Sequence, residues 1–309
     1  MSRLCAQLTM SLVGLGLALV GSPAAGGSLR DAPAAVAYVQ NAAAVSKSDD
    51  SQAAAPAPAS SKAADDEDES APQPLEPDFT IINLPTTLRL PEHKADFRLM
   101  HRFQGNLTEG GFLFQLENLF GMDQGATISL ELRYGVMKHL EAVVARGNLD
   151  RTIDFYGKYD GWRQSGSMPV GISAIGSIEG ANNFRRDYAP ALGASVSRTL
   201  GGFVAVYATP FWVHNSAAVT GVTRDTGFVG IGGRVKIANN TYVVGEVSPR
   251  IAGYAPGDPE YGFALEKRVG GHVFQLNFTN GFATTFAQIA RGGFPSSLYL
   301  GFNLSRKFF

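Results

Sequence analysis

The chain has almost no cysteine: Cys5 is the single one among its 309 residues. Cys5 lies before the first apolar stretch, too early for the lipidated cysteine that would follow such a stretch. The rest of the sequence therefore excludes a disulfide framework, a thiol nucleophile and a cysteine-ligated metal site. A chain without cysteine is also suited to an oxidising compartment.

Long apolar runs are scarce as well. The apolar stretch at residues 8–20 is too short to span a bilayer as a helix. Arg3 before it and the small residues at 22–25 after it are typical of a secretory signal peptide, which we assign to residues 1–25. An uncleaved anchor helix is the alternative interpretation of the same stretch.

Residues 26–76 contain few of the large apolar side chains that a core requires. Ala, Pro, Ser and acidic residues dominate this segment, and an acidic run stands at 65–69. Such a composition buries too little apolar area to offset the entropy of the chain, so we expect a disordered linker. We interpret the acidic run as a solvated tail, with contact to a periplasmic protein partner as the alternative.

Residues 77–309 show no long helical periodicity and instead alternate apolar and polar residues over short segments. For example, Leu130 and Leu132 alternate with Glu131 and Arg133. An antiparallel transmembrane β-barrel needs this two-residue period, because one face of each strand meets lipid and the other meets the lumen. We predict twelve strands, at residues 96–103, 127–134, 140–146, 152–162, 169–178, 189–199, 203–213, 226–237, 241–251, 261–269, 272–279 and 298–308.

Aromatic residues near the ends of these strands predict the interfacial girdles of a membrane barrel. They are Tyr134, Tyr159, Trp162, Phe203, Trp212, Tyr242, Tyr261 and Tyr299. A soluble β-sandwich or lipocalin-like barrel is the structural rival, since its strands also alternate. In that rival, however, the apolar residues face a core, so arginine and lysine would seldom occupy the inward positions.

The predicted connections alternate between tight turns and longer loops, as expected for a bacterial outer-membrane barrel with both termini in the periplasm. The first long loop contains residues 112–120, which have a partly helical pattern. We expect this segment to pack against the barrel rim. The alternatives are insertion into the lumen as a constriction and an amphipathic position on the membrane surface.

The last strand ends in large apolar residues, as is typical of barrels that the barrel-assembly machinery inserts into the outer membrane. We assign this C-terminal signal to Leu300, Phe302, Leu304, Phe308 and Phe309. The expected partners are thus the lipid bilayer and the assembly machinery, and nothing in the sequence indicates a nucleic-acid partner.

Four segments carry a resemblance to a known family: residues 90–103, 118–127, 132–135 and 154–159, with Phe-Gly-Met-Asp-Gln-Gly inside the second. Over about residues 79–309 the chain resembles an uncharacterised family of bacterial outer-membrane β-barrel proteins, catalogued as a domain of unknown function. The resemblance implies the fold and the membrane location. It implies no activity and no catalytic residue.

Catalytic chemistry finds little support in the sequence. His101, His139, His214 and His272 are candidates for a barrel hydrolase, but none has a nucleophile-elbow context. Their spacing also matches no metal-binding motif. We therefore expect a protein that is not an enzyme and has no cofactor and no metal site.

Charged residues on the inward rows predict the properties of the lumen. They are Arg98, Arg102, Glu131, Arg133, Asp154, Lys158, Arg234, Lys236, Glu246 and Arg250. Twelve strands lie between the eight of a barrel filled by side chains and the sixteen of an open channel, so we expect a narrow pore or a plug of ion pairs. The leading hypothesis is passive passage or binding of small polar solutes. The alternatives are a non-conducting membrane scaffold that engages periplasmic partners and, third, an outer-membrane hydrolase.

Overall fold

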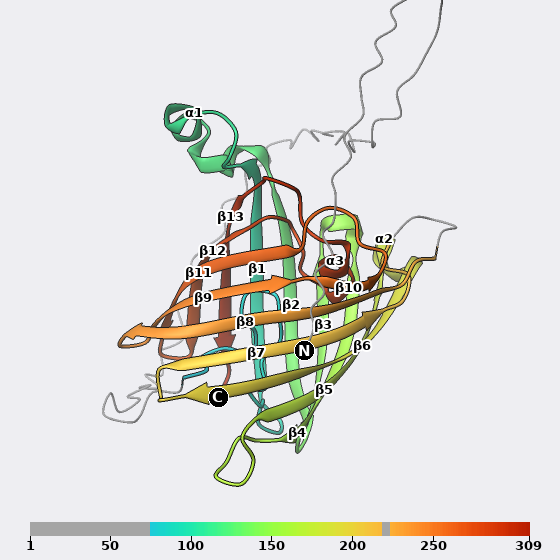
Figure 1. The fold of residues 1–309 in the computed structure, drawn as a ribbon, viewed down its shortest axis with the longest axis vertical. Coiled ribbons are helices and arrows are strands. Elements are labelled where there is room, and N and C mark those ends of the chain that lie inside the picture. Colours follow the sequence, from blue (N-terminus) through green and yellow to red (C-terminus); the bar gives the residue numbers. More distant parts are fainter. Residues whose placement is uncertain (1–74, 218–222) are drawn as a thin grey trace, which may run out of the picture. The chain divides into compact units, whose positions relative to one another are not determined.

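The structure, a computed structural model, describes residues 75–217 and 223–309 of the chain (Figure 1). The signal peptide and nearly all of the linker expected from the sequence lie outside these described residues. No helix within the two described ranges is long and apolar enough to cross a membrane.

Within the described residues, thirteen strands form one antiparallel sheet. They are β1 (Ala95–Asn106), β2 (Ala126–Met137), β3 (Leu140–Gly147), β4 (Ile153–Trp162), β5 (Gly171–Gly180), β6 (Arg186–Leu200), β7 (Val204–Val213), β8 (Thr226–Ala238), β9 (Thr241–Ser248), β10 (Arg250–Gly253), β11 (Glu260–Val269), β12 (His272–Thr279) and β13 (Tyr299–Lys307). β9 and β10 both pair with β8 and are separated only by Pro249, so they form one interrupted barrel strand. The barrel therefore has twelve strands, as the sequence predicts.

The sheet closes on itself through two pairings. The first strand pairs with the last, from Asp96 opposite Lys307 to Arg102 opposite Gly301. β8 pairs with β9, which joins the two ends of the remaining strand order. Closure is necessary in lipid, because an open sheet edge would leave backbone N–H and C=O groups without partners.

Burial alternates along the strands as the apolar pattern predicts. In β2, Leu130 and Leu132 are exposed on the outer face, whereas Glu131 and Arg133 are buried inside. The same face assignment is confirmed for β8 and β12. Charged groups stay inside because placing Arg or Lys against hydrocarbon costs roughly 2–4 kcal/mol at the bilayer midplane.

Two aromatic residues do not take the interfacial position expected from the sequence. Tyr242 and Tyr299 are buried and face the barrel interior. Tyr242 lies opposite Lys236 on β8 and Glu266 on β11, and residues that pair across an antiparallel ladder point to the same side. A position near a strand end therefore does not by itself identify an interfacial aromatic residue, because aromatic residues also occur on the inward row.

Short helices occupy several of the long connections. They are α1 (Phe112–Glu117), η1 (Leu119–Gln124), η2 (Leu149–Arg151), α2 (Ala181–Phe184) and α3 (Phe286–Arg291). α1 stands away from the barrel wall beyond the ends of β1 and β2, whereas α3 lies within the ring of strands (Figure 1). The contact with the barrel rim expected for residues 112–120 is made through η1, which packs on β1 and β13, while most of the apolar side chains of this segment are exposed.

A small hairpin before the first strand lies inside the barrel, and we call residues 78–87 the N-terminal hairpin. Its two arms are joined by hydrogen bonds from the Ile81 N–H to the Leu84 carbonyl (2.8 Å) and from the Thr86 N–H to the Phe79 carbonyl (2.8 Å). Phe79, Ile81, Ile82 and Leu84 are almost completely buried. The sequence analysis assigned these residues to the barrel domain without foreseeing that they fill its lumen.

α3 fills the lumen from the opposite end. It belongs to the connection between β12 and β13, and the Thr285 hydroxyl caps its first turn by accepting a hydrogen bond from the Gln288 N–H (3.3 Å). The Phe286 ring stacks on Phe211 of β7, with 4.3 Å between ring centroids. Residues of α3 and of the N-terminal hairpin thus join one buried apolar cluster inside the barrel.

Candidate functional site

The barrel interior is the candidate functional site, and the charged residues predicted to line it lie on its inner face. Eight are buried: Arg98, Arg102, Glu131, Arg133, Asp154, Lys158, Arg234 and Glu246. Lys236 and Arg250 are half-buried, and each lies opposite an inward residue, Tyr242 and Phe228 respectively. The role of these residues in solute passage remains a prediction.

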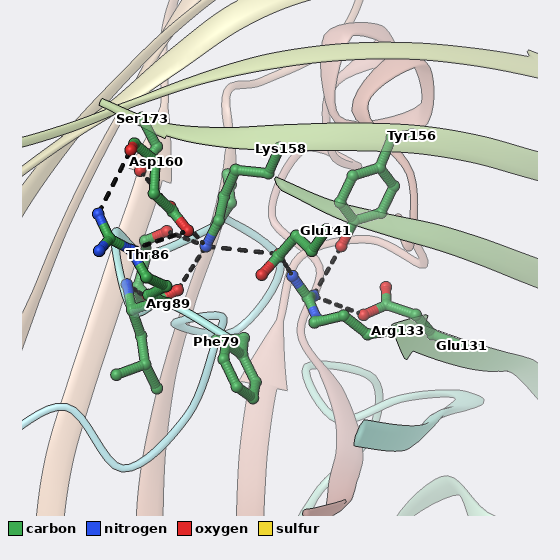
Figure 2. A network of polar contacts seen from close by, with 12 residues as sticks. Phe79, Thr86, Arg89, Glu131, Arg133, Glu141, Tyr156, Lys158, Asp160 and Ser173 are labelled. Carbon is green, nitrogen blue, oxygen red and sulfur yellow. Dashed lines mark hydrogen bonds and ion pairs between the residues drawn. The ribbon is translucent and has the colours of Figure 1, made fainter. Parts of the chain in front are cut away.

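Arg133 organises the polar network on the wall formed by β2, β3 and β4 (Figure 2). Its guanidinium donates hydrogen bonds to Glu131 (2.7 Å), to Glu141 and to the Tyr156 hydroxyl (2.7 Å). Since Arg133 is nearly inaccessible to solvent, these acceptors replace the water that the cation loses on burial. Removing the cation would leave two carboxylates buried without their main partner.

Lys158 connects this wall to the N-terminal hairpin and the chain that follows it. The ammonium group lies 3.4 Å from Glu141 and 3.5 Å from Asp160. It also donates to the carbonyl oxygens of Thr86 (3.3 Å) and Leu88 (2.5 Å). Figure 2 shows the lysine between the two acidic side chains and the incoming backbone.

Phe79 of the hairpin lies beneath the same cations. The Arg133 guanidinium carbon is 5.0 Å from the centre of the Phe79 ring, and the Lys158 nitrogen is 5.9 Å from it. Aromatic rings attract cations at these distances through the negative charge of the ring face. The Phe79 ring thus fills space beside Arg133 and Lys158, and its face provides a favourable contact for both cations.

Glu246 of β9 binds the tip of the hairpin. Its carboxylate accepts hydrogen bonds from three successive backbone N–H groups, those of Ile82 (2.9 Å), Asn83 (2.9 Å) and Leu84 (3.1 Å). At the tip these N–H groups point away from the hairpin, so no carbonyl of its other arm can accept their hydrogen bonds. A buried carboxylate with several backbone donors is a strong anchor because each bond is assisted by its charge.

Donors from around the wall bind the hairpin carbonyls. Arg98 donates to the Ile82 carbonyl (2.5 Å), and Arg234 donates to the Thr80 carbonyl (3.0 Å). Further donors are Gln275 to the Ile81 carbonyl (2.6 Å), Asn303 to the Ile82 carbonyl (3.2 Å) and Ser195 to the Pro85 carbonyl (2.8 Å). Side chains from many strands thus satisfy the backbone of a segment whose buried polar groups would otherwise be unpaired.

The remaining predicted residues hold other parts of the interior. Arg102 donates to the side chains of Asn83 (3.0 Å) and Asn303 (2.8 Å). Arg250 binds the carbonyls of Gly257 (2.8 Å) and Pro256 (2.5 Å), so it fixes the connection between β10 and β11 instead of facing an open lumen. The Asp154 Oδ1 atom has no hydrogen-bond partner among the described residues.

Several important residues were missed by the sequence analysis. Glu141, Asp160 and Glu266 are buried acidic residues that pair with predicted cations, and Glu266 lies 2.9 Å from Arg234. All three occupy inward positions of strands whose alternation was recognised, so the same pattern would have found them. The hairpin itself carried a weaker signal, a short apolar segment before the first strand.

A polar pocket remains where the hairpin meets the wall. Its volume is about 290 Å³, and its lining includes Thr87, Arg89, Arg163 and Ser197. The Thr87 and Ser197 hydroxyls are in direct hydrogen-bond contact there. Among the residues that the structure describes, the hairpin and α3 both pack into the barrel interior.

The histidines do not converge on a common site. His101 lies on the outer face and stacks on Phe302 with 4.9 Å between ring centroids. His214 lies 2.8 Å from Asp225 in the connection that follows β7. No group of three or more histidine, cysteine or acidic residues in the described ranges is arranged to hold a metal ion.

The chain is similar to several solved structures, each at low sequence identity. The KdgM porin in complex with disordered oligogalacturonate is 9% identical, with 70% of this chain and 99% of that chain covered and a TM-score of 0.45. The NanC porin is 6% identical over 69% and 98% of the two chains, with a TM-score of 0.45. Omp33 of Acinetobacter baumannii is 11% identical over 70% and 99%, with a TM-score of 0.38.

No curated protein matches the chain. A family model does: residues 78–308 match the membrane bound beta barrel domain DUF5777, which confirms the resemblance seen in the sequence. The matched range begins at the N-terminal hairpin and ends in the last strand, so it covers the plugged barrel as a whole. A membrane-bound barrel of this kind resides in the lipid bilayer of the bacterial outer membrane. The chain belongs to the family of DUF5777 membrane-bound β-barrel domains.

Proposed function

We propose that this outer-membrane barrel is a channel for small polar solutes that its own N-terminal hairpin keeps closed. Passage is passive and requires the hairpin to leave the lumen. The proposal includes no catalytic step.

The observation that carries the proposal is the way in which the hairpin is held. Its backbone is bound by charged and polar side chains of the wall, including Glu246, Arg98 and Arg234. Water or a polar solute offers these side chains equivalent partners. Each bond therefore contributes only about 0.5–1.5 kcal/mol net, or about 1.5–3 kcal/mol where a charged group takes part.

The lumen left by the hairpin would suit polar solutes. Arg98, Arg102, Lys158 and Arg234 would line it as cations, with Glu246 and Glu266 as anions close by. Such a surface holds water, which an apolar cavity of the same size does not. α3 would remain as a constriction and would restrict passage to small molecules.

The connections support the orientation that this proposal assumes. The N-terminal hairpin and the end of β13 lie at the end of the barrel that carries the tight turns, which we assign to the periplasm. A periplasmic partner that binds the acidic run of the linker would then be able to pull the hairpin out. The C-terminal apolar residues, including Phe308 and Phe309, would serve the barrel-assembly machinery on the same side.

A reversible lock tests the proposal. Thr87 and Ser197 touch through their hydroxyl groups, so the double variant Thr87→Cys, Ser197→Cys in a Cys5→Ser background places two thiols within bonding reach. We expect single-channel openings in a planar bilayer under reducing conditions and their loss on oxidation. Each single-cysteine variant serves as the control and should be insensitive to oxidation.

Two results would contradict the proposal. Openings that persist in the oxidised double variant would show that solutes bypass the hairpin. Absence of conductance in the reduced double variant, in the unmodified protein and in a Glu246→Gln variant would favour the non-conducting scaffold, since all three leave the hairpin free to move.

A further inference from the structure

The connection between β1 and β2 carries a group of exposed apolar side chains, which we call the apolar cap. It comprises Phe112, Leu113, Phe114, Leu116, Leu119 and Phe120 of α1 and η1. Phe112 and Leu113 are 71% and 72% exposed, and the other four are 37–50% exposed. Residues 111–122 contain a single charged side chain, Glu117. Soluble surfaces seldom gather so many large apolar groups in one patch.

The apolar cap has the reverse of the usual surface-helix arrangement, because its polar side chain is buried and its apolar side chains are exposed. Gln115 is the buried residue of α1, and its side chain donates to the carbonyls of Asn106 (3.1 Å) and Glu109 (2.5 Å). The polar side chain therefore ties the helix to the loop while the apolar ones point away. In a water-facing helix the apolar side would be turned inward.

The backbone holds this arrangement in place. Leu119 and Phe120 adopt positive φ angles of 46° and 55°, which are unfavourable for side chains of this size. η1 also docks closely on β1, since a Cβ atom on Gly105 would lie 2.1 Å from the Gly121 Cα. The exposed side chains are thus presented by a fixed support.

We infer that the apolar cap inserts into the boundary between lipid headgroups and acyl chains beside the barrel. The cap continues the lipid-facing surface, because η1 packs on β1 and β13, whose outer rows include Phe103 and Phe302. Figure 1 shows α1 set off from the wall beyond the ends of β1 and β2, where a segment can lie along the membrane. Short apolar segments beside a membrane protein bind this boundary by burying their apolar face in it.

Tryptophan fluorescence in vesicles tests this inference. The chain has two tryptophans, Trp162 and Trp212, and both are replaced by phenylalanine in the test background. Phe112→Trp then places a single reporter in the cap, and Asn239→Trp places the control in the exposed two-residue turn between β8 and β9. The full-length proteins are reconstituted into phosphatidylcholine vesicles with and without brominated acyl chains.

We expect the cap tryptophan to emit at shorter wavelength than the turn tryptophan and to lose intensity in brominated vesicles. Emission typical of water together with quenching by iodide would overturn the inference. Shielding from both quenchers, combined with cross-linked dimers, would overturn it in favour of a second copy of the chain. Leu113→Trp gives an independent reading if Phe112→Trp does not fold, as judged by its circular dichroism.

Discussion

Two segments fill the same lumen, and the wall holds them by different combinations of forces. The N-terminal hairpin buries the apolar side chains of its tip, and the wall also binds its backbone through donors and acceptors such as Glu246, Arg98 and Lys158. α3 is bound mainly through apolar side chains, above all by Phe286 against Phe211. Polar contacts can be exchanged for water, whereas apolar packing cannot be replaced by any solvent molecule. The larger polar share of its contacts suits the hairpin to movement, whereas α3 remains in the lumen as a constriction.

The largest effect should follow from removing the packing of α3. Phe286→Ala deletes the ring that stacks on Phe211 and lies 5.5 Å from Tyr156. Loss of a buried phenylalanine costs about 3–5 kcal/mol in proteins, so the free energy of unfolding in urea should fall by about this amount. Phe294→Ala, at a half-exposed ring of the same connection, is the control and should cost much less. An equal loss of unfolding free energy in both variants would show that apolar packing of Phe286 does not hold α3 in the lumen.

The next effect should come from the anchor of the hairpin tip. Glu246→Gln replaces the carboxylate that accepts three backbone N–H groups by a neutral amide with one acceptor. Losing about 1.5–3 kcal/mol of charge-assisted bonding should raise the open fraction in planar bilayers roughly ten- to one-hundredfold. Glu109→Gln, at an exposed carboxylate of the first long loop, should leave the open fraction unchanged. An unchanged open fraction in Glu246→Gln would argue against polar anchoring.

The smallest effect should arise at the base of the hairpin. Thr87→Val removes the hydroxyl that contacts Ser197 while keeping the shape of the side chain. One neutral hydrogen bond is worth about 0.5–1.5 kcal/mol, so the open fraction should rise only about two- to tenfold. Single-channel recordings beside those of Glu246→Gln give the ranking, and a larger effect for Thr87→Val would reverse the proposed order of anchoring.

The wall of the barrel could be predicted from the sequence because each strand obeys one physical constraint. An outward residue meets lipid and an inward one does not, so the two-residue period separates Leu130 from Glu131 without knowledge of the fold. The twelve strands and the inward placement of Arg133 and Lys158 follow from that period.

The contents of the lumen could not be predicted in the same way. Whether a loop inserts into the lumen depends on the side chains of the opposite wall, and these residues are distant from the loop in sequence. Phe286 enters because Tyr156, Phe211 and Phe228 leave an apolar region on the inner face. Inward aromatic residues were the available signal. Together with the sequence Thr285 to Gln288, which is typical of a helix start, they would have indicated that the last long loop enters the lumen.

The attachment of the N-terminal hairpin has a kinetic consequence. Residues 88–94 connect it directly to β1, whereas α3 is joined to a strand at each end. The hairpin can therefore withdraw without separating any strand from its neighbours. So short a tether keeps the withdrawn hairpin near the mouth at a high effective concentration, so recapture is intramolecular and fast. Openings should therefore be brief unless an external force or ligand holds the hairpin outside.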